Sequence, residues 1–141
     1  MSDEALLLGL MAAFYREERL AYAEAVARTG LRELFTRPEL GRVFILRGDE
    51  ESRARGHLVL TFGFSLEFRG RFVLLDELFV DDGARGRGYG VEAIELAARW
   101  AKAQGAAALR LEVNRANRHG REIYLRREFK NEERDLLTRW L

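Results

Sequence analysis

The alternation of apolar and polar positions predicts a continuous series of helices and strands along the 141-residue chain. Apolar side chains recur at helical spacing over residues 3–17, 21–35 and 91–104. Patterns typical of strands cover residues 41–47, 56–67, 71–80, 107–113 and 133–141. We also expect a polar turn at 48–51 and a short helix after Asn117. Because no linker, repeat or low-complexity segment interrupts this order, residues 1–141 are interpreted as one α/β domain.

A glycine-rich turn separates the apolar strand at 71–80 from the helix at 91–104. Its sequence is Arg85-Gly86-Arg87-Gly88-Tyr89-Gly90. The glycines remove side chains where the first N–H groups of a helix point outward, and these groups carry a partial charge of about +0.5. The two arginines add full positive charges. The turn is therefore predicted to bind an anion such as pyrophosphate, with a plain surface turn as the alternative.

The spacing of the glycines distinguishes between phosphate-binding motifs. The dinucleotide pattern G-x-G-x-x-G fails because its third glycine would fall on Val91, and no lysine lies near the turn to complete a P-loop. The pattern that fits is Arg-x-x-Gly-x-Gly, from Arg85 through Gly88 to Gly90. In this respect the chain resembles the GCN5-related N-acetyltransferase (GNAT) superfamily, whose pyrophosphate signature is [Gln/Arg]-x-x-Gly-x-[Gly/Ala].

Two further segments extend the resemblance over nearly the whole chain. Residues 75–80, Leu-Asp-Glu-Leu-Phe-Val, are similar to the acidic strand that precedes the family signature. Residues 117–124 match the family pattern Asn-x-x-Ala-x-x-Leu-Tyr, with Gly120 in place of alanine, and Phe129 follows at the family's interval. The resemblance implies the GNAT fold, a mixed, mostly antiparallel central sheet flanked by helices, and acetyl-CoA as co-substrate. The acidic strand also resembles that of the diamine and thialysine acetyltransferase branch.

The chain departs from the family pattern at two places. Glu128 stands where the family has a glycine that ends a helix in the left-handed conformation, so we expect this turn to be made in another way. Ser2-Asp3 already looks like a helix cap, so the family's first strand is predicted to be missing. The loss would leave a sheet edge for a second copy to cover. This argument and the resemblance favour a homodimer.

The resemblance assigns acetyl-CoA to three segments of the chain. The strand backbone before the turn would pair with the pantetheine arm, and the N–H of Leu78 or Phe79 would polarise the thioester carbonyl. Asn117 would cap the next helix and contact the same arm, while Arg126 and Arg127 would either reach the 3′-phosphate or lie on a solvated helix face. The predicted cofactor-binding residues are Leu78, Phe79, Val80, Arg85, Gly86, Arg87, Gly88, Tyr89, Gly90, Asn117, Arg126 and Arg127.

Acetyl transfer to an amine needs a base for the ammonium proton and an acid for the departing thiolate. Asp76 and Glu77 are the candidate bases. Since adjacent strand residues point to opposite faces, only one of them should line a given cleft. We favour Asp76, which aligns with a base in the family, unless a bulge brings Glu77 into the cleft. Tyr124 is the predicted acid, and its alternative role is that of a half-buried anchor for the last helix.

The resemblance implies that the acceptor binds between the first two helices, with the loop that joins them, and the hairpin that contains residue 67. Tyr15, Glu18, Tyr22 and Glu67 combine aromatic rings with carboxylates, which suits a cationic amine with an aliphatic body. We therefore expect a primary amine on a small polyamine-like or amino-acid-like molecule. A protein N-acetyltransferase and a non-catalytic acetyl-CoA-binding regulatory protein are the alternatives.

Composition excludes several other classes. A net charge of +1 argues against a nucleic-acid-binding protein. The absence of cysteine excludes thiol catalysis, and with only His57 and His119 no histidine-rich metal site is expected. His57 is interpreted as structural. No apolar run is long enough to cross a membrane and no signal peptide is visible, so we expect a cytoplasmic protein.

Overall fold

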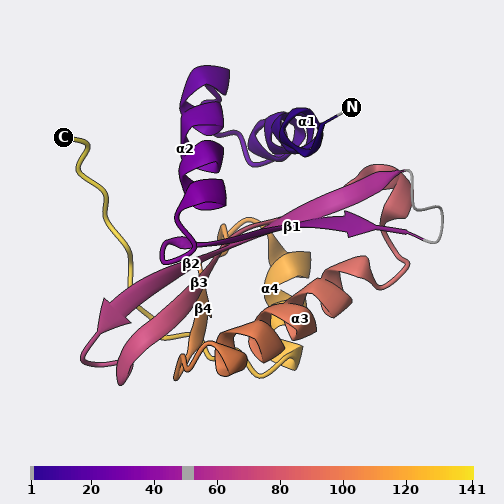
Figure 1. The fold of residues 1–141 in the computed structure, drawn as a ribbon. Helices are drawn as coiled ribbons and strands as arrows, with labels where there is room; N and C mark the ends of the chain where they lie inside the picture. The colour runs from indigo at the N-terminus through magenta and orange to yellow at the C-terminus, as the bar shows by residue number, and fades with distance from the viewer. Residues whose placement is uncertain (1, 49–52) are drawn as a thin grey trace.

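The computed structural model describes residues 2–48 and 53–141, so most of the predicted turn at 48–51 lies outside the described residues (Figure 1). The helices are α1 (Asp3–Glu17), α2 (Glu24–Thr36), α3 (Tyr89–Ala103) and α4 (Arg118–Arg126). The strands are β1 (Gly41–Arg47), β2 (Ala54–Ser65), β3 (Gly70–Val80) and β4 (Leu109–Leu111), and a 3₁₀ turn, η1 (Asp82–Ala84), follows β3. None of the described helices combines the length and apolar character needed to span a membrane.

The strands form one sheet in the order β1-β2-β3-β4. β2 pairs antiparallel with both β1 and β3, whereas β3 and β4 are parallel, so the predicted mixed, mostly antiparallel sheet is confirmed. Within the described residues no strand precedes α1, because Ser2 already caps this helix by accepting a hydrogen bond from the N–H of Ala5 at 3.3 Å. The described residues therefore contain no counterpart of the family's first strand, as predicted.

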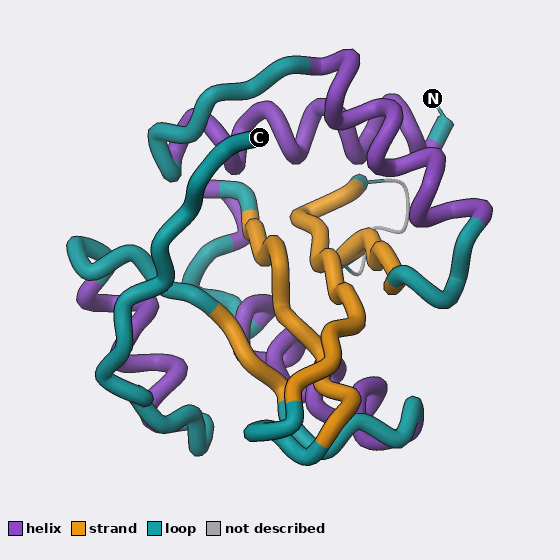
Figure 2. Tube along the Cα trace, turned by 90° about the vertical axis from the view of Figure 1, so that its left-hand side faces the viewer, coloured by secondary structure: helices purple, strands orange, loops and turns teal. Residues whose placement is uncertain are grey.

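Helices cover both faces of the sheet, with α1 and α2 on one side and α3 and α4 on the other (Figures 1 and 2). One core joins sheet and α3 through Leu58, Leu60, Val73, Leu75, Ala93, Ala97 and Ala101. A second core lies under α1 and α2 and consists of Leu7, Leu8, Met11 and Leu31, packed against Val43 and Ile45. Each fully buried leucine stabilises the fold by about 1.5–3 kcal/mol, so the two layers hold the sheet from both sides.

A β-bulge interrupts β3 at its acidic residues. Val59 of β2 pairs with Glu77 and the next residue, Leu60, pairs with Leu75, so Asp76 is the extra residue. Leu75 packs in the α3 core, while Glu77 and Phe79 contact residues of α1. The prediction that only one of the two acids could line a cleft is wrong, because the bulge brings both to the side of α1 and α2.

Several predicted boundaries shift in the structure. The helix predicted at 21–35 begins at Glu24, because Ala23 has an extended backbone (φ −126°). The helix predicted at 91–104 begins at Tyr89, directly after the N-cap Gly88. β4 covers only the middle of the predicted strand at 107–113, although Ala107 and Ala108 before it also make backbone hydrogen bonds to β3.

The final strand predicted at 133–141 is wrong. Residues 128–141 form an extended tail that leaves the sheet and has no strand neighbour within the described chain (Figure 1). Arg134 pairs with Glu67 and Asp135 with Arg115, which fix the middle of the tail. Leu136, Leu137 and Trp140 beyond this point are exposed. The described part of the chain offers this segment no strand to pair with.

The turn after α4 shows how the chain accommodates Glu128 in place of the family's helix-ending glycine. Glu128 adopts the left-handed conformation itself, with φ +70°. The N–H of Phe129 donates to the carbonyl of Tyr124 at 3.2 Å, which is the long hydrogen bond of a Schellman helix end. The expectation that the turn would be made in another way is wrong. The chain keeps the conformation at a cost of about 1–2 kcal/mol for a residue with a Cβ.

Candidate active site

The turn at residues 85–90 leads into the N-terminus of α3. Gly86 and Gly88 have φ values of +79° and +84°, and a Cβ at either position would meet nothing within 4 Å. Gly88 is the N-cap of the 15-residue helix α3, so the first helical N–H groups point out of the helix beside an open surface. Together with the helix dipole, they form a cradle that suits a pyrophosphate.

Arg85 connects this turn to β3, to the 3₁₀ turn η1 and to the end of α1. Its Nε donates to the carbonyl of Val80 at 3.0 Å, and its guanidinium pairs with Glu17 at 2.5 Å and with Asp82 at 2.7 Å. Glu17 is the last residue of α1, so this ion pair connects the turn to the first helix. The structure thus gives Arg85 a role in shaping the cradle, while Arg87 is exposed beside it.

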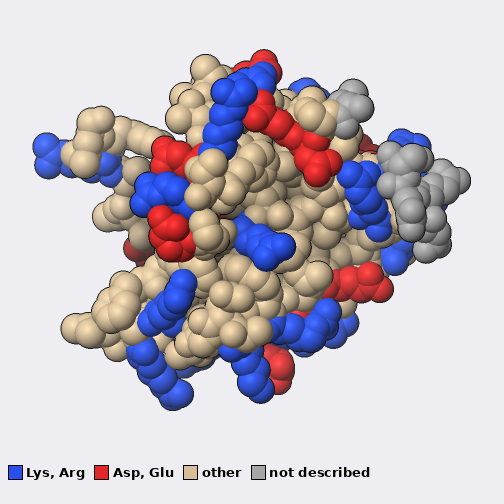
Figure 3. All heavy atoms as spheres, viewed as in Figure 1, with Lys and Arg blue, Asp and Glu red and all other residues tan. Residues whose placement is uncertain are grey.

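The predicted basic residues of α4 are exposed and paired. Arg126 lies 3.6 Å from Glu122, and Arg127 lies 3.5 Å from Glu95 of α3. Figure 3 shows basic and acidic side chains interspersed, with large uncharged areas between them, on the face viewed there. Contact of Arg126 or Arg127 with a cofactor phosphate stays a prediction.

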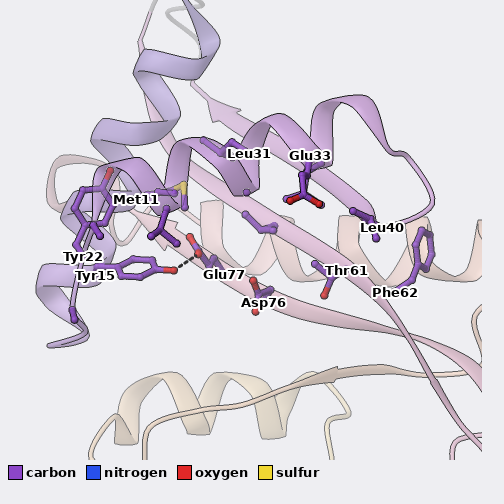
Figure 4. A pocket seen from close by; sticks show the side chains of 17 residues that line it. Met11, Tyr15, Tyr22, Leu31, Glu33, Leu40, Thr61, Phe62, Asp76 and Glu77 are labelled. Atoms are coloured by element: carbon purple, nitrogen blue, oxygen red, sulfur yellow. Dashed lines mark hydrogen bonds between the residues drawn. The ribbon is translucent and has the colours of Figure 1, made fainter. Parts of the chain in front are cut away.

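A cavity of about 670 Å³ lies between α1, α2 and the sheet (Figure 4). Helix α1 contributes Met11 and Tyr15, the α2 side contributes Tyr22 and an apolar wall, and β2 contributes Thr61. Asp76 and Glu77 of the bulge lie at the sheet side of the cavity, as Figure 4 shows. The cavity thus ends at the part of β3 that directly precedes the residues predicted to bind the thioester.

Two donors hold the buried carboxylate of Glu77. Its Oε2 accepts a hydrogen bond from the hydroxyl of Tyr15 at 3.0 Å, and its Oε1 lies 2.9 Å from Nε2 of His57. His57 is fully buried, and its ring nitrogen Nδ1 has no hydrogen-bond partner in the structure. Burial, followed by the charge of Glu77, raises the pKa of Tyr15 far above its usual value, so this phenol stays protonated and donates.

Asp76 differs from its neighbour because part of it reaches the solvent of the cavity. Protein atoms nevertheless surround much of its carboxyl group, and this desolvation raises the pKa of Asp76 above the ordinary value of 3.8. The charges of Glu77 and Glu112 raise the pKa further. A carboxylate with a raised proton affinity that opens into a cavity is suited to accept a proton from a bound ammonium.

Tyr124 lies on α4, with its ring 5.7 Å from that of Phe129. Its phenol is largely surrounded by protein, and this burial raises its pKa above 10.0, with a smaller contribution from the charge of Glu18. The group is therefore fully protonated at neutral pH and can donate a proton. Glu18 itself is the C-cap of α1, which brings the end of that helix toward α4.

The structure separates the predicted substrate residues. Tyr15 and Tyr22 line the cavity together with both acids, and their rings pack edge to face at 5.6 Å. Glu18 lies near Tyr124 and does not line the cavity. Glu67 is at the tip of the β2–β3 hairpin, paired with Arg134 of the tail and outside the cavity lining.

Asn117 caps α4, as expected. Its side-chain oxygen accepts a hydrogen bond from the N–H of Gly120 at 3.0 Å. A Cβ at position 120 would lie 2.5 Å from the Asn117 side chain as it is placed here, so an alanine would require this side chain to shift. Among the residues that the structure describes, no group of three or more His, Asp or Glu side chains could hold a metal ion.

Sequence reasoning missed two parts of the site. The first is His57, which was interpreted as structural but hydrogen-bonds a cavity carboxylate. Only its pairing across β2 and β3 could have revealed this. The second is the α2 wall of the cavity, where Ala27 and Gly30 line the space one helical turn apart and Ala23 lines it just before the helix begins. Small residues at this spacing were a usable signal of an open helix face.

Comparisons with known proteins agree with this architecture. An integron cassette protein from the mobile metagenome of Cole Harbour Salt Marsh is 31% identical, with a TM-score of 0.85 over 99% of this chain and 85% of that chain. A protein described as a probable acetyltransferase is 21% identical, with a TM-score of 0.83 over 98% of this chain and 91% of that chain. Ribosomal-protein-alanine N-acetyltransferase from Brucella melitensis biovar Abortus 2308 is 17% identical, with a TM-score of 0.75 over 98% and 94%.

These last two likenesses show the fold alone. A search of curated proteins finds no significant match, and nothing in the comparisons distinguishes the diamine and thialysine branch, which stays a prediction. The decisive match is that of the acetyltransferase (GNAT) family, whose profile covers residues 10–129. The chain therefore belongs to the GNAT family of acetyltransferases.

Proposed function

We propose that this acetyltransferase transfers the acetyl group of acetyl-CoA to the primary amine of a small molecule. One observation carries the proposal: the bulge in β3 directs two adjacent carboxylates, Asp76 and Glu77, into a cavity, directly before residues 78–80 in the same strand. An acceptor in this cavity would have its amine beside a base and close to the strand predicted to hold the thioester.

Each residue has a defined task in the proposed reaction. When bound, acetyl-CoA supplies an acetyl thioester. Asp76 takes a proton from the ammonium of the acceptor, directly or through one water, so that the neutral amine can attack the carbonyl carbon. The backbone N–H of Leu78 or Phe79 stabilises the negative charge that develops on the carbonyl oxygen. Tyr124 gives its proton to the sulfur as the C–S bond breaks, and the second proton of the attacking nitrogen passes to the resulting tyrosinate through water. The products are the N-acetylated amine and free coenzyme A, and Asp76 releases its proton to solvent.

Glu77 supports this chemistry without leaving its hydrogen bonds. The hydroxyl of Tyr15 and Nε2 of His57 fix both of its oxygens, so its charge stays next to Asp76 and beside the amine. A fixed negative charge there attracts the ammonium and raises the proton affinity of Asp76. The two acids thus divide the work, one as the base and the other as a fixed charge.

The proposal is tested by incubating the purified protein with acetyl-CoA and a panel of primary amines, with release of free thiol as the readout. Thiol release that depends on the amine, together with an acetylated product in mass spectrometry, is the expected result. Tight acetyl-CoA binding without turnover on any acceptor would favour the non-catalytic regulatory protein. Acetylation of peptide N-termini but not of small amines would favour the protein N-acetyltransferase.

We also propose that the protein is a homodimer. β1 is an outer strand of the sheet, and the tail exposes Leu136, Leu137 and Trp140, so a second copy can cover backbone and apolar surface together. Light scattering at micromolar concentration should then give about twice the 16.3 kDa mass of the chain. A clean monomer would contradict this part of the proposal.

A further inference from the structure

The charges that line the cavity are all negative. Of the 17 side chains drawn around it, three belong to acids, Glu33, Asp76 and Glu77, and none to lysine, arginine or histidine. A substrate carboxylate would find no cation in this space and would lie near fixed negative charges. The cavity therefore disfavours an acceptor that carries its own carboxylate next to the amine.

The negative charge is concentrated at one end of the cavity. Asp76 and Glu77 lie together at the sheet side, where no arginine or lysine of the described residues pairs with either of them and His57 contacts Glu77. Glu33 lies on α2, and its Oε2 is 3.5 Å from a guanidinium nitrogen of Arg37, one helical turn along. Arg37 also pairs with Glu39 at 2.9 Å, and the side chains of Glu33 and Arg37 are about half exposed. A second ammonium at this end would therefore meet only a solvated carboxylate with a cation already nearby, so the cavity favours a single positive charge at its sheet side.

Between these ends the walls are apolar and leave room. Met11, Leu31 and Leu34 present aliphatic side chains, and α2 adds the small residues Ala27 and Gly30. A Cβ at Gly30 would meet nothing within 4 Å. The tyrosine hydroxyls are already engaged, that of Tyr15 with Glu77 and that of Tyr22 with the carbonyl of Leu8 at 3.1 Å. The middle of the cavity therefore offers an acceptor mainly apolar contact.

From these features we infer that the acceptor is a primary monoamine with an apolar body, such as a straight, branched or aryl-substituted alkylamine. Its ammonium lies at Asp76 and Glu77, and its body lies against the α2 wall. This inference rests on the proposed function and narrows it, since it excludes amino acids and diamines as preferred acceptors.

Two matched pairs of amines test the inference. 3-Methylbutylamine and leucine have the same carbon branch and differ only by a carboxylate. n-Pentylamine and 1,4-diaminobutane have the same length and differ only by a second ammonium. We expect kcat/KM to be at least about 10²-fold higher for the monoamine of each pair, because a desolvated charge without a partner costs several powers of ten in discrimination. Equal or better use of leucine or the diamine would overturn the inference while leaving amine acetylation intact.

Binding measurements keep the inference testable in the absence of turnover. If no amine releases thiol, the proposed function fails. Calorimetric titration of the same four amines in the presence of acetyl-CoA then still reports the preference of the cavity. Tighter binding of both monoamines supports the inference, and tighter binding of leucine or the diamine, or no binding of any of the four, overturns it.

A cavity-filling variant locates the acceptor. Gly30→Leu places a side chain in the open space at the α2 wall, and we expect it to lower kcat/KM for n-pentylamine at least about tenfold. Ala25→Leu is the matched control, since Ala25 lies on the same helix, is exposed and does not line the cavity. Equal values of kcat/KM for Gly30→Leu, Ala25→Leu and the parent would place the acceptor elsewhere.

Discussion

The proposed acetyl-CoA site and the proposed acceptor site, which both adjoin β3, are built in opposite ways. On the cofactor side, one contiguous turn at residues 85–90 presents backbone N–H groups and the start of a helix, with little need for specific side chains. On the acceptor side, α1, α2, β2 and β3 all contribute side chains, and these meet at Asp76 and Glu77. The first arrangement tolerates changes elsewhere in the chain, whereas the second depends on long-range packing and on one extra residue in a strand.

The largest expected effect is on the cofactor side. Gly88→Asp should abolish acetyl-CoA binding, because it puts a negative charge at the N-cap where the pyrophosphate would lie. Calorimetry would measure the affinity. Gly105→Asp is the matched control, since Gly105 has φ +79° just beyond the other end of α3, close to the +84° of Gly88. If both variants lose binding equally, backbone strain is responsible and the cradle is misassigned.

On the acceptor side, Asp76→Asn should lower kcat/KM by about 10²-fold or more at neutral pH, because the general base is lost. Activity should then rise only at higher pH, where an amine with a pKa of about 10 arrives deprotonated. A pH profile of kcat/KM measures both changes. In the parent, the base must be ionised, so activity should fall as the pH drops through the raised pKa of Asp76.

Glu77→Gln is the control for this prediction. It removes a charge that raises the pKa of Asp76, so the acidic limb of the profile should move to lower pH. Near neutrality kcat should change little, while KM for the amine should rise because the fixed charge beside the ammonium is lost. A larger loss of rate in Glu77→Gln than in Asp76→Asn would make Glu77 the base. Asp76 would then supply the fixed charge, and the two proposed roles would be exchanged.

Tyr124→Phe tests the link between the two sides. The variant should keep its affinity for acetyl-CoA but lose about 10²-fold in kcat, since only the proton donor for the sulfur is removed. Tyr22→Phe is a useful comparison, because this tyrosine lines the acceptor cavity and uses its hydroxyl in a bond to a backbone carbonyl. A Tyr124→Phe enzyme as fast as the parent would return Tyr124 to a packing role.

The contrast between the two sides also explains what the sequence could predict. The glycine turn, the flanking strand and helix and the Asn117 cap were predictable, because each depends on residues close together in the chain. The bulge at Asp76 was not, since the local pattern of β3 is the same with or without it and only the register with β2 reveals it. The partnership of His57 with Glu77 and the α2 wall likewise depend on packing between distant segments.

The tail at residues 128–141 shows a second limit of prediction from the sequence, because a strand was predicted there that the structure does not contain. Residues 133–141 contain leucines and a tryptophan but no regular alternation of apolar and polar positions, and the described part of the chain provides no neighbouring strand there. The tail instead leaves Leu136, Leu137 and Trp140 exposed. This exposure is consistent with the homodimer proposed above, in which a second copy could supply that neighbour.

The smallest expected effect is on stability, and it should leave the acetyl-CoA site and the acceptor site unchanged. Glu128 holds a left-handed conformation beyond α4, and its carboxyl group makes no ion pair among the described residues. Glu128→Gly should therefore raise the free energy of unfolding by about 1 kcal/mol, since relief of the Cβ strain exceeds the entropy that glycine adds to the unfolded chain. Thermal unfolding should show a rise in Tm of a few degrees, with unchanged kcat/KM. Glu128→Ala keeps the Cβ and should give no such gain; equal stabilisation by alanine would mean that the carboxyl group, and not the backbone, is the source of the strain.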